Sequence, residues 1–285
     1  MALQTESALQ YWPAPAKLNL FLHITGRHPD GYHDLQTLFQ ILDWGDELRF
    51  SINESGQISR SCNIEGISEA DDICVRAAHL LKARCDVQKG VHIDLVKRIP
   101  MGAGLGGGSS DAATVLLALN QLWSLGLTRQ QLADLGLELG ADVPVFVYGR
   151  SALGEGRGEK LQAVRLGQRF YVLVFPDISI STAEVFRHPQ LKRDSELIDM
   201  SRASLESGRN DCEPVVVKMY PELKEIMQDL SSWGQPHMSG TGSTIFLQFD
   251  DKKTAISTAS ELKCRYNVRP VGGVDQSLLL DCLSA

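Results

Sequence analysis

The chain has 285 residues, of which 43% are hydrophobic and 22% charged, a composition typical of globular proteins with a sizeable core. The formal net charge of -7 argues against a general nucleic-acid or anionic-membrane partner. No apolar run approaches the length of a membrane helix and the six cysteines include no Cys-x-x-Cys pair, so we expect a cytoplasmic protein with reduced thiols and no zinc site.

The first predicted element is a strand from Ala14 to His23, in which apolar and polar side chains alternate. Lys17 and Asn19 are two residues apart, so their side chains project from the same face of this strand as near neighbours. From this pattern alone, an edge strand with a solvated polar face is the simpler interpretation.

A turn sequence, Pro29-Asp30-Gly31, comes next and is followed by two aromatic rings, Tyr32 and His33. The rings fit either ordinary packing at a rim or a stacking platform for a nucleobase. His23, His28 and His33 recur at a spacing that suits neither a strand face nor a metal-binding helix. We therefore predict no metal-ligating residues.

Two strands and a helix are predicted between this turn and residue 96. Alternating apolar residues predict strands around Leu48–Ile52 and Val91–Leu95. The run from Asp71 to Lys82 has the apolar spacing of a helix with one inward face.

A glycine-rich stretch, Pro100-Met-Gly-Ala-Gly-Leu-Gly-Gly-Gly-Ser-Ser-Asp111, follows the second of these strands and precedes a predicted helix over Ala112–Trp123. Glycines leave backbone N–H groups bare and allow positive φ, so such a loop can wrap an anion. The helix N-terminus adds unpaired N–H groups and the positive end of a dipole. Ser109 and Ser110 add hydroxyls for a phosphate or its metal.

Other glycine loops fit this stretch less well. The dinucleotide fingerprint needs an acidic residue at the end of a second strand, where this chain predicts a helix. A Walker loop needs Gly-Lys-Ser/Thr, but no lysine occurs between Pro100 and Asp111. A flexible turn would not require five glycines before two serines and a helix.

Thr128-x-x-Gln131 predicts a capping box at the start of a helix that ends near Gly140. Asp142 then lies between this helix end and an apolar run, where it is either a turn aspartate or a functional carboxylate. We expect a loop over residues 149–160, rich in glycine and charge, that borders the nucleotide.

The C-terminal half begins with an apolar strand over Phe170–Phe175, near which we place a domain change. Phe186 is either a core residue or part of a site. A second glycine-rich turn, 238–244, precedes a strand over Ile245–Phe249 and is followed by a helix over Thr254–Cys264 and a strand over Val268–Val271. A plain hairpin turn is the competing interpretation of 238–244.

Three of these motifs, in this order, resemble those of the GHMP small-molecule kinases: Pro15-Ala-Lys-Leu-Asn-Leu, the glycine loop, and Gly140-Ala-Asp-Val-Pro144. The turn 238–244 is similar to the family's third kinase motif. The resemblance implies an α+β, two-domain GHMP kinase fold. An N-terminal domain similar to domain 2 of ribosomal protein S5 would span residues 1–165, and a C-terminal ferredoxin-like domain residues 166–285.

The resemblance also implies roles for single residues. Lys17 and Asp142 would be catalytic, and Asn19, Tyr32, His33 and Phe186 would bind substrate, with the two rings of Tyr32 and Phe186 enclosing cytosine. The ATP-binding residues would be those of the loop: Pro100, Met101, Gly102, Ala103, Gly104, Leu105, Gly106, Gly107, Gly108, Ser109 and Ser110. At Asp72 the family usually has an asparagine near adenine; because an ionised aspartate only accepts hydrogen bonds, that contact is not carried over.

The implied reaction transfers the γ-phosphoryl group of ATP, with Mg²⁺, to the 2-hydroxyl of 4-diphosphocytidyl-2-C-methyl-D-erythritol. The partner would thus be a small-molecule cytidine diphosphate substrate, and no obligate protein partner is predicted. Three alternatives stay open: a GHMP kinase for homoserine, mevalonate or a sugar, a dinucleotide-dependent oxidoreductase, and a non-catalytic nucleotide-binding module.

Overall fold

The computed structural model describes residues 11–29, 31–61, 66–199 and 209–283. Its strands are β1 (Trp12–Arg27), β2 (His33–Asn53), β3 (Ile58–Arg60), β4 (Gly90–Val96), β5 (Ala152–Gly156), β6 (Lys160–Ala163), β7 (Arg169–Phe175), β8 (His237–Met238), β9 (Ile245–Phe249) and β10 (Asn267–Val274). Its helices are α1 (Ile73–Arg84), α2 (Gly107–Leu122), α3 (Arg129–Leu139), α4 (Val143–Tyr148), α5 (Thr182–Arg187), α6 (Glu213–Met219), α7 (Pro221–Leu230), α8 (Lys252–Leu262) and α9 (Leu279–Cys282).

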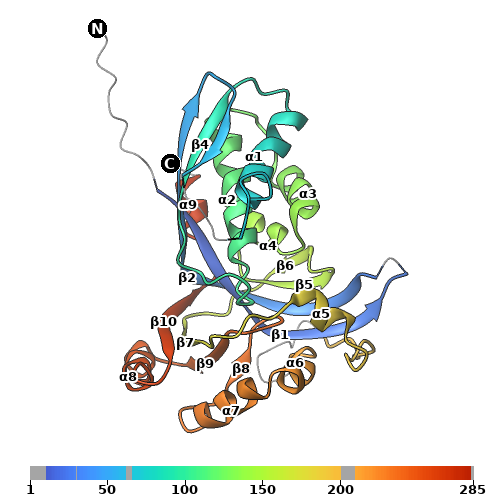
Figure 1. Cartoon of the computed structure of the whole chain (residues 1–285), viewed down its shortest axis with the longest axis vertical. Helices are drawn as coiled ribbons and strands as arrows, with labels where there is room; N and C mark the ends of the chain where they lie inside the picture. The colour runs from blue at the N-terminus through green and yellow to red at the C-terminus, as the bar shows by residue number, and fades with distance from the viewer. Residues whose placement is uncertain (1–10, 30, 62–65, 200–208, 284–285) are drawn as a thin grey trace.

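The described strands form one ten-stranded sheet whose main path is β3-β4-β2-β10-β7-β9-β8, with β1 and β5 paired to β2 and β6 paired to β5. Helices α1–α4 lie in one lobe and α5–α8 in the other, and the long β1–β2 hairpin runs across both (Figure 1). Because β10 pairs with β2 and with β7, it joins the strands of the two lobes into one sheet. The domain boundary at residue 165 stays a prediction.

Each lobe has its own hydrophobic core. In the first, the buried residues of α2 pack with those of α1, α4 and the strands β2 and β4, and Leu279 of α9 returns to this core. In the second, apolar residues of α6, α7 and α8 cover β7 and β9. A third cluster, which includes Leu18, Leu105 and Phe246, joins the two. The region where the lobes meet is thus firmly packed around β1 and the glycine loop.

β1 is longer than the predicted strand, and both of its faces are buried. Lys17 and Asn19 are each only 3% exposed, so the interpretation of a solvated edge is wrong. The reason is that the glycine loop covers this face: the backbone N–H of Lys17 donates to the carbonyl of Leu105 at 3.1 Å. The register of β1 against β2 shifts between Pro15 and Lys17 and again between Asn19 and Phe21, so irregular pairing flanks the two polar side chains.

The structure confirms the predicted strands around residues 48–52, 91–95, 170–175, 245–249 and 268–271, and the helices over 71–82 and 254–264, with ends shifted by a few residues. The capping box of Thr128 and Gln131 is present at the start of α3. Helix α2 begins at Gly107, five residues before the predicted start at Ala112, so it includes the two serines.

The expected loop over residues 149–160 is wrong, because Ala152–Gly156 forms β5 and pairs with β2. The loop was predicted partly because of Gly154, since glycine usually interrupts a strand. Here a Cβ at Gly154 would lie 2.8 Å from the ring of Phe39, so only glycine lets the two strands approach.

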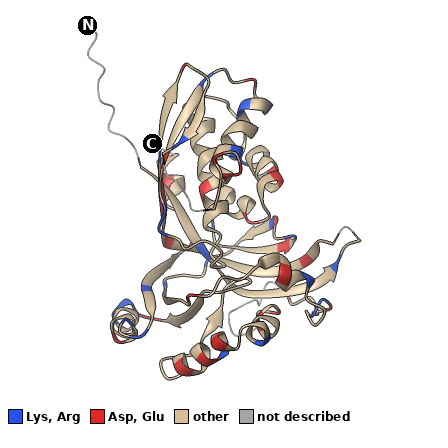
Figure 2. Cartoon of the chain, in the orientation of Figure 1, with Lys and Arg blue, Asp and Glu red and all other residues tan. Residues whose placement is uncertain are grey.

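Lys and Arg lie interspersed with Asp and Glu over both lobes in the view of Figure 2, which shows no broad face of one sign. Within the described ranges, no helix combines the length and apolarity that crossing a membrane requires.

Candidate active site

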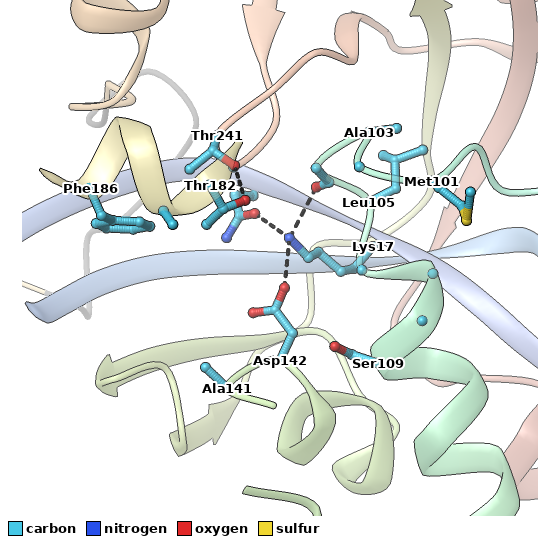
Figure 3. Close-up of a pocket in the computed structure, with 18 of the residues that line it drawn as sticks. Lys17, Met101, Ala103, Leu105, Ser109, Ala141, Asp142, Thr182, Phe186 and Thr241 are labelled. Carbon is cyan, nitrogen blue, oxygen red and sulfur yellow. Dashed lines mark hydrogen bonds and ion pairs between the residues drawn. The ribbon is translucent and has the colours of Figure 1, made fainter. Parts of the chain in front are cut away.

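A cavity of about 960 Å³ lies where the lobes meet, a size typical of small-molecule sites. Its walls come from β1, β2, the glycine loop, the start of α4, the β5–β6 turn, α5 and the turn before β9. Phe186 lies at one end, Met101 at the other, and Lys17 with Asp142 between them (Figure 3). We call the part around Lys17, Asp142 and the glycine loop the transfer end, and the part around Tyr32, His33 and Phe186 the base end.

Lys17 is buried at the centre of the transfer end. Its Nζ lies 3.2 Å from Oδ2 of Asp142 and donates to Oδ1 of Asn19 at 2.6 Å and to the carbonyl of Gly104 at 3.1 Å. Dashed lines in Figure 3 join this nitrogen to the three oxygens. A buried ammonium is costly unless it is paired and hydrogen-bonded, so these oxygens hold Lys17 in place.

Asn19 is oriented by β2 and the second glycine-rich turn. Its Nδ2 donates to Oγ1 of Thr37 at 2.8 Å, and that hydroxyl donates to the carbonyl of Phe21 at 2.6 Å. The backbone N–H of Asn19 donates to Oγ of Ser239 at 3.2 Å. The amide oxygen is thereby turned toward Lys17, which fixes the pair that β1 brings together.

Asp142 lies at the N-terminus of α4, but its side chain makes no capping hydrogen bond there. The carboxylate instead faces Lys17 and is 36% exposed. The local sequence was compatible with a turn aspartate. The structure instead places this carboxylate against Lys17 of β1, far away in the sequence.

The glycine loop needs glycine for close approach as well as for its turns. Gly104 has φ +73°, and a Cβ there would lie 2.2 Å from the carbonyl oxygen of Ser239. Ser239 Oγ also donates to the carbonyl of Gly104 at 2.9 Å, and Thr244 N to that of Ala103 at 3.2 Å. The second glycine-rich turn joins the antiparallel strands β8 and β9, as the hairpin interpretation predicted, and it also packs directly against the first glycine-rich loop.

Ten of the eleven predicted ATP-binding residues line the cavity, and Ser110 is the exception. Its hydroxyl is buried and has no hydrogen-bond partner among the described residues, whereas Ser109 lines the cavity. Helix α2 starts here without a side-chain cap and without an acidic residue in its first turn. Its first N–H groups are thus left for an anion.

A buried charge network beneath the loop was not predicted. Lys97 lines the cavity, and its Nζ lies 2.6 Å from Oδ2 of Asp46 and 2.6 Å from Oδ2 of Asp111. Burial lowers the pKa of Lys97, but the two carboxylates outweigh it and raise that pKa, so Lys97 is a cation at neutral pH. The sequence shows Lys97, but it does not show that Asp46 and Asp111 pair with it.

Asp72 is the N-cap residue of α1. Its Oδ1 accepts from the backbone N–H groups of Cys74 and Val75 at 2.9 and 3.2 Å, and its Oδ2 lies 3.4 Å from Nε of Arg60. Asp72 also lines the cavity. Both oxygens of the Asp72 carboxylate are therefore engaged by the chain itself.

The base end brings together residues from three segments. Tyr32 is 53% exposed, and the guanidinium of Arg157 lies 3.8 Å from its ring centroid. His33 is buried, and its ring centroid lies 5.1 Å from that of Phe186. Arg157, in the β5–β6 turn, and Arg193, which contacts His33, are further residues that the sequence analysis missed. An isolated arginine carries no sequence signal for such a contact.

Comparison with known proteins agrees with this geometry. Residues 72–150 match the family model of the GHMP kinases N terminal domain, and residues 189–268 that of the GHMP kinases C terminal domain. A 4-diphosphocytidyl-2-C-methyl-D-erythritol kinase from Nitrosococcus oceani is 48% identical, covering 95% of this chain and 97% of the relative. The enzyme of that name from Burkholderia pseudomallei is 46% identical, covering 92% and 93%.

Solved structures show the same fold. The crystal structure of a 4-(cytidine 5'-diphospho)-2C-methyl-D-erythritol kinase has a TM-score of 0.81 and 34% identity, covering 93% of this chain and 99% of that one. The mevalonate kinase of Methanococcus jannaschii has a TM-score of 0.69 at 14% identity, covering 94% and 99%, and shows the fold alone. The chain therefore belongs to the GHMP kinase family, has its two-domain α+β fold and is a kinase.

Proposed function

We propose that this kinase transfers the γ-phosphoryl group of ATP to the 2-hydroxyl of 4-diphosphocytidyl-2-C-methyl-D-erythritol, a step of non-mevalonate isoprenoid synthesis in the cytoplasm. The names of the similar relatives support this substrate. The observation that carries the proposal is one cavity with a lysine–aspartate pair beside a glycine loop and aromatic rings at its other end.

At the transfer end, the glycine loop and the first N–H groups of α2 hold the phosphates of ATP. Lys17 stabilises the charge on the transferred group, because phosphoryl transfer depends mostly on positioning and charge neutralisation. Asp142 accepts or orients the proton of the attacking hydroxyl. Its exposure of 36% leaves the carboxylate accessible to a bound alcohol.

Mg²⁺ fits this end as a companion of ATP rather than as a resident metal. Among the described residues, no group of three His, Cys, Asp or Glu side chains could hold an ion, but Mg²⁺ bound through phosphates and water needs only one or two protein oxygens. The hydroxyl of Ser109, which lines the cavity, is the oxygen that would hold it. When bound, the ion neutralises charge on the phosphates.

At the base end, Tyr32 and Phe186 offer aromatic faces for cytosine, and His33 offers a ring nitrogen to the base edge. Stacking on an aromatic side chain contributes about 1–3 kcal/mol per base. Homoserine and mevalonate have no base to stack, so a site for those alcohols would gain nothing from these rings. This difference favours the cytidine substrate over the other alcohols of the family.

The test is ADP release from Mg·ATP, measured in a coupled assay with the cytidine substrate, homoserine and mevalonate in parallel. We expect turnover with the cytidine substrate alone. Turnover with another alcohol instead would keep the kinase but overturn the substrate. ATP binding without turnover of any of them would favour a nucleotide-binding module.

A further inference from the structure

His33 is held through one ring nitrogen by an arginine from a distant segment. Nε of Arg193 donates to Nε2 of His33 at 3.0 Å. A guanidinium has only donors and stays protonated in proteins, so the Nε2 atom that faces it must carry a lone pair. Imidazole that accepts at Nε2 has its hydrogen on Nδ1. The contact therefore selects one of the two tautomers of neutral His33.

Arg193 is itself fixed by the chain that follows α5. Its Nη2 donates to the carbonyls of Phe186 and His188, each at 2.9 Å, and its Nη1 to that of Leu191 at 3.0 Å. These carbonyls lie at and beyond the C-terminal end of α5, where helix carbonyls lack internal partners. These bonds fix the plane of the guanidinium, so its Nε stays directed at Nε2 of His33.

The surroundings also keep the His33 ring neutral. Burial lowers the pKa of His33, and the charges of Arg193 and of Arg27, at the end of β1, lower it further. The ring that packs on His33 from α5 is the uncharged Phe186. Neutral His33 with its hydrogen on Nδ1 is thus the state favoured by both the hydrogen bond and the charges.

We propose that Arg193 is a positioning residue that locks His33 in the neutral Nδ1–H tautomer, so that the base end offers a ring donor that pairs with N3 of cytosine and rejects the N3–H of uracil. The proposal rests on the cytidine substrate proposed above. N3 is a hydrogen-bond acceptor in cytosine, whereas N3–H is a donor in uracil. A fixed donor opposite N3 therefore pairs with cytosine, but with uracil it would leave two donors facing each other.

The first test needs no variant. The ¹³C and ¹⁵N chemical shifts of the His33 ring, assigned by comparison with His33→Gln, report which nitrogen carries the hydrogen. We expect the Nδ1–H tautomer in the ligand-free protein near neutral pH. An Nε2–H tautomer, or a ring that exchanges between both, overturns the proposal whatever the enzyme's activity.

The second test compares Arg193→Gln, whose amide can donate or accept, with Arg193→Lys, which keeps a donor. The measured quantity is kcat/KM for the cytidine substrate divided by that for its uridine counterpart. We expect this ratio to fall about tenfold in Arg193→Gln and to recover at least in part in Arg193→Lys. Lys192→Gln, which removes a neighbouring exposed charge, should keep the parent ratio.

The pH dependence separates tautomer control from a merely structural role. Protonated histidine carries hydrogens on both nitrogens, so Arg193→Gln should regain cytosine preference as pH falls below the pKa of His33, which rises when the arginine charge is removed. The parent should be selective on both sides of that pKa. A selectivity ratio that is equal in Arg193→Gln and the parent, or reduced equally at every pH, contradicts the proposal. No turnover by the parent contradicts the proposed substrate instead, and leaves the tautomer measurement valid.

Discussion

The two ends of the cavity are built in different ways. At the transfer end, Lys17 is 3% exposed and has charged or carbonyl partners from β1, the glycine loop and α4. At the base end, Tyr32 is 53% exposed and its ring is covered by a guanidinium from a hairpin turn. The transfer end is rigid and preorganised for charge, whereas the base end is an open aromatic surface aligned by arginines. The difference predicts that changes at the transfer end lower kcat and changes at the base end raise KM for the alcohol.

The largest effect is expected for Asp142→Asn. The amide keeps the shape of the side chain but cannot accept the hydroxyl proton, so we expect kcat to fall about 10²–10⁴-fold with little change in either KM. Steady-state kinetics of ADP release measure this. Asp134→Asn, at an exposed position of α3, is the control. Turnover within a few-fold of the parent would remove Asp142 from the mechanism.

Lys17→Met should follow closely. The apolar side chain fills the buried space but leaves Asp142 and the transferred group without their cation, and loss of one such stabilising donor typically costs about 10²–10³-fold in kcat. The same assay and a thermal melt measure it, the melt showing whether the variant is folded. A folded variant with parental kcat would show that Lys17 only supports the structure.

The glycine loop offers a matched pair, Gly104→Ala and Gly102→Ala. Both positions have positive φ, but an added Cβ meets the carbonyl of Ser239 only at Gly104 and open space at Gly102. A left-handed non-glycine residue costs about 1–2 kcal/mol in either case. We expect Gly104→Ala to raise KM for ATP about tenfold more than Gly102→Ala does. Equal effects would mean that contact between the two glycine-rich turns does not shape the ATP site.

At the base end, Tyr32→Leu should raise KM for the cytidine substrate and leave kcat and KM for ATP unchanged. Loss of about 1–3 kcal/mol of stacking corresponds to a roughly fivefold to hundredfold rise. Tyr11→Leu is the control, because Tyr11 is also exposed (47%) and also lies under an arginine, Arg49. A rise in KM for ATP instead would place the nucleotide, not the alcohol, on Tyr32.

The smallest effect is expected for Arg157→Met. An exposed cation–π contact contributes about 0.5–1 kcal/mol, so KM for the cytidine substrate should rise about two- to fivefold. Arg49→Met removes the equivalent contact on Tyr11 and should leave this KM at the parent value. An effect larger than that of Tyr32→Leu would mean that Arg157 contacts the substrate directly.

The same contrast explains what the sequence could predict. The glycine loop and the strands around it were predictable because each is a contiguous pattern with its own periodicity or turn chemistry. Lys17 and Asp142 were identified as candidates from short motifs, but their contact at 3.2 Å depends on how β1, the loop and α4 pack. Their assigned roles stay predictions, as do those of the substrate-binding residues.

Arg157, Arg193 and the network of Lys97 were not predictable, because a single charged residue looks the same on a solvated surface and in a site. The burial of both faces of β1 was missed for a related reason. Its polar alternation is typical of a half-exposed strand, and only the glycine loop that lies over Lys17 and Asn19 converts that face into an interior. Tertiary contacts between distant segments carry the information that local patterns lack.

The most direct test of this division is to measure kcat and KM for the cytidine substrate in Asp142→Asn and Tyr32→Leu side by side. We expect different constants to change: Asp142→Asn lowers kcat at an unchanged KM, and Tyr32→Leu raises KM at an unchanged kcat. If both changes alter the same constant, the cavity is not divided into an end that reacts and an end that binds the base.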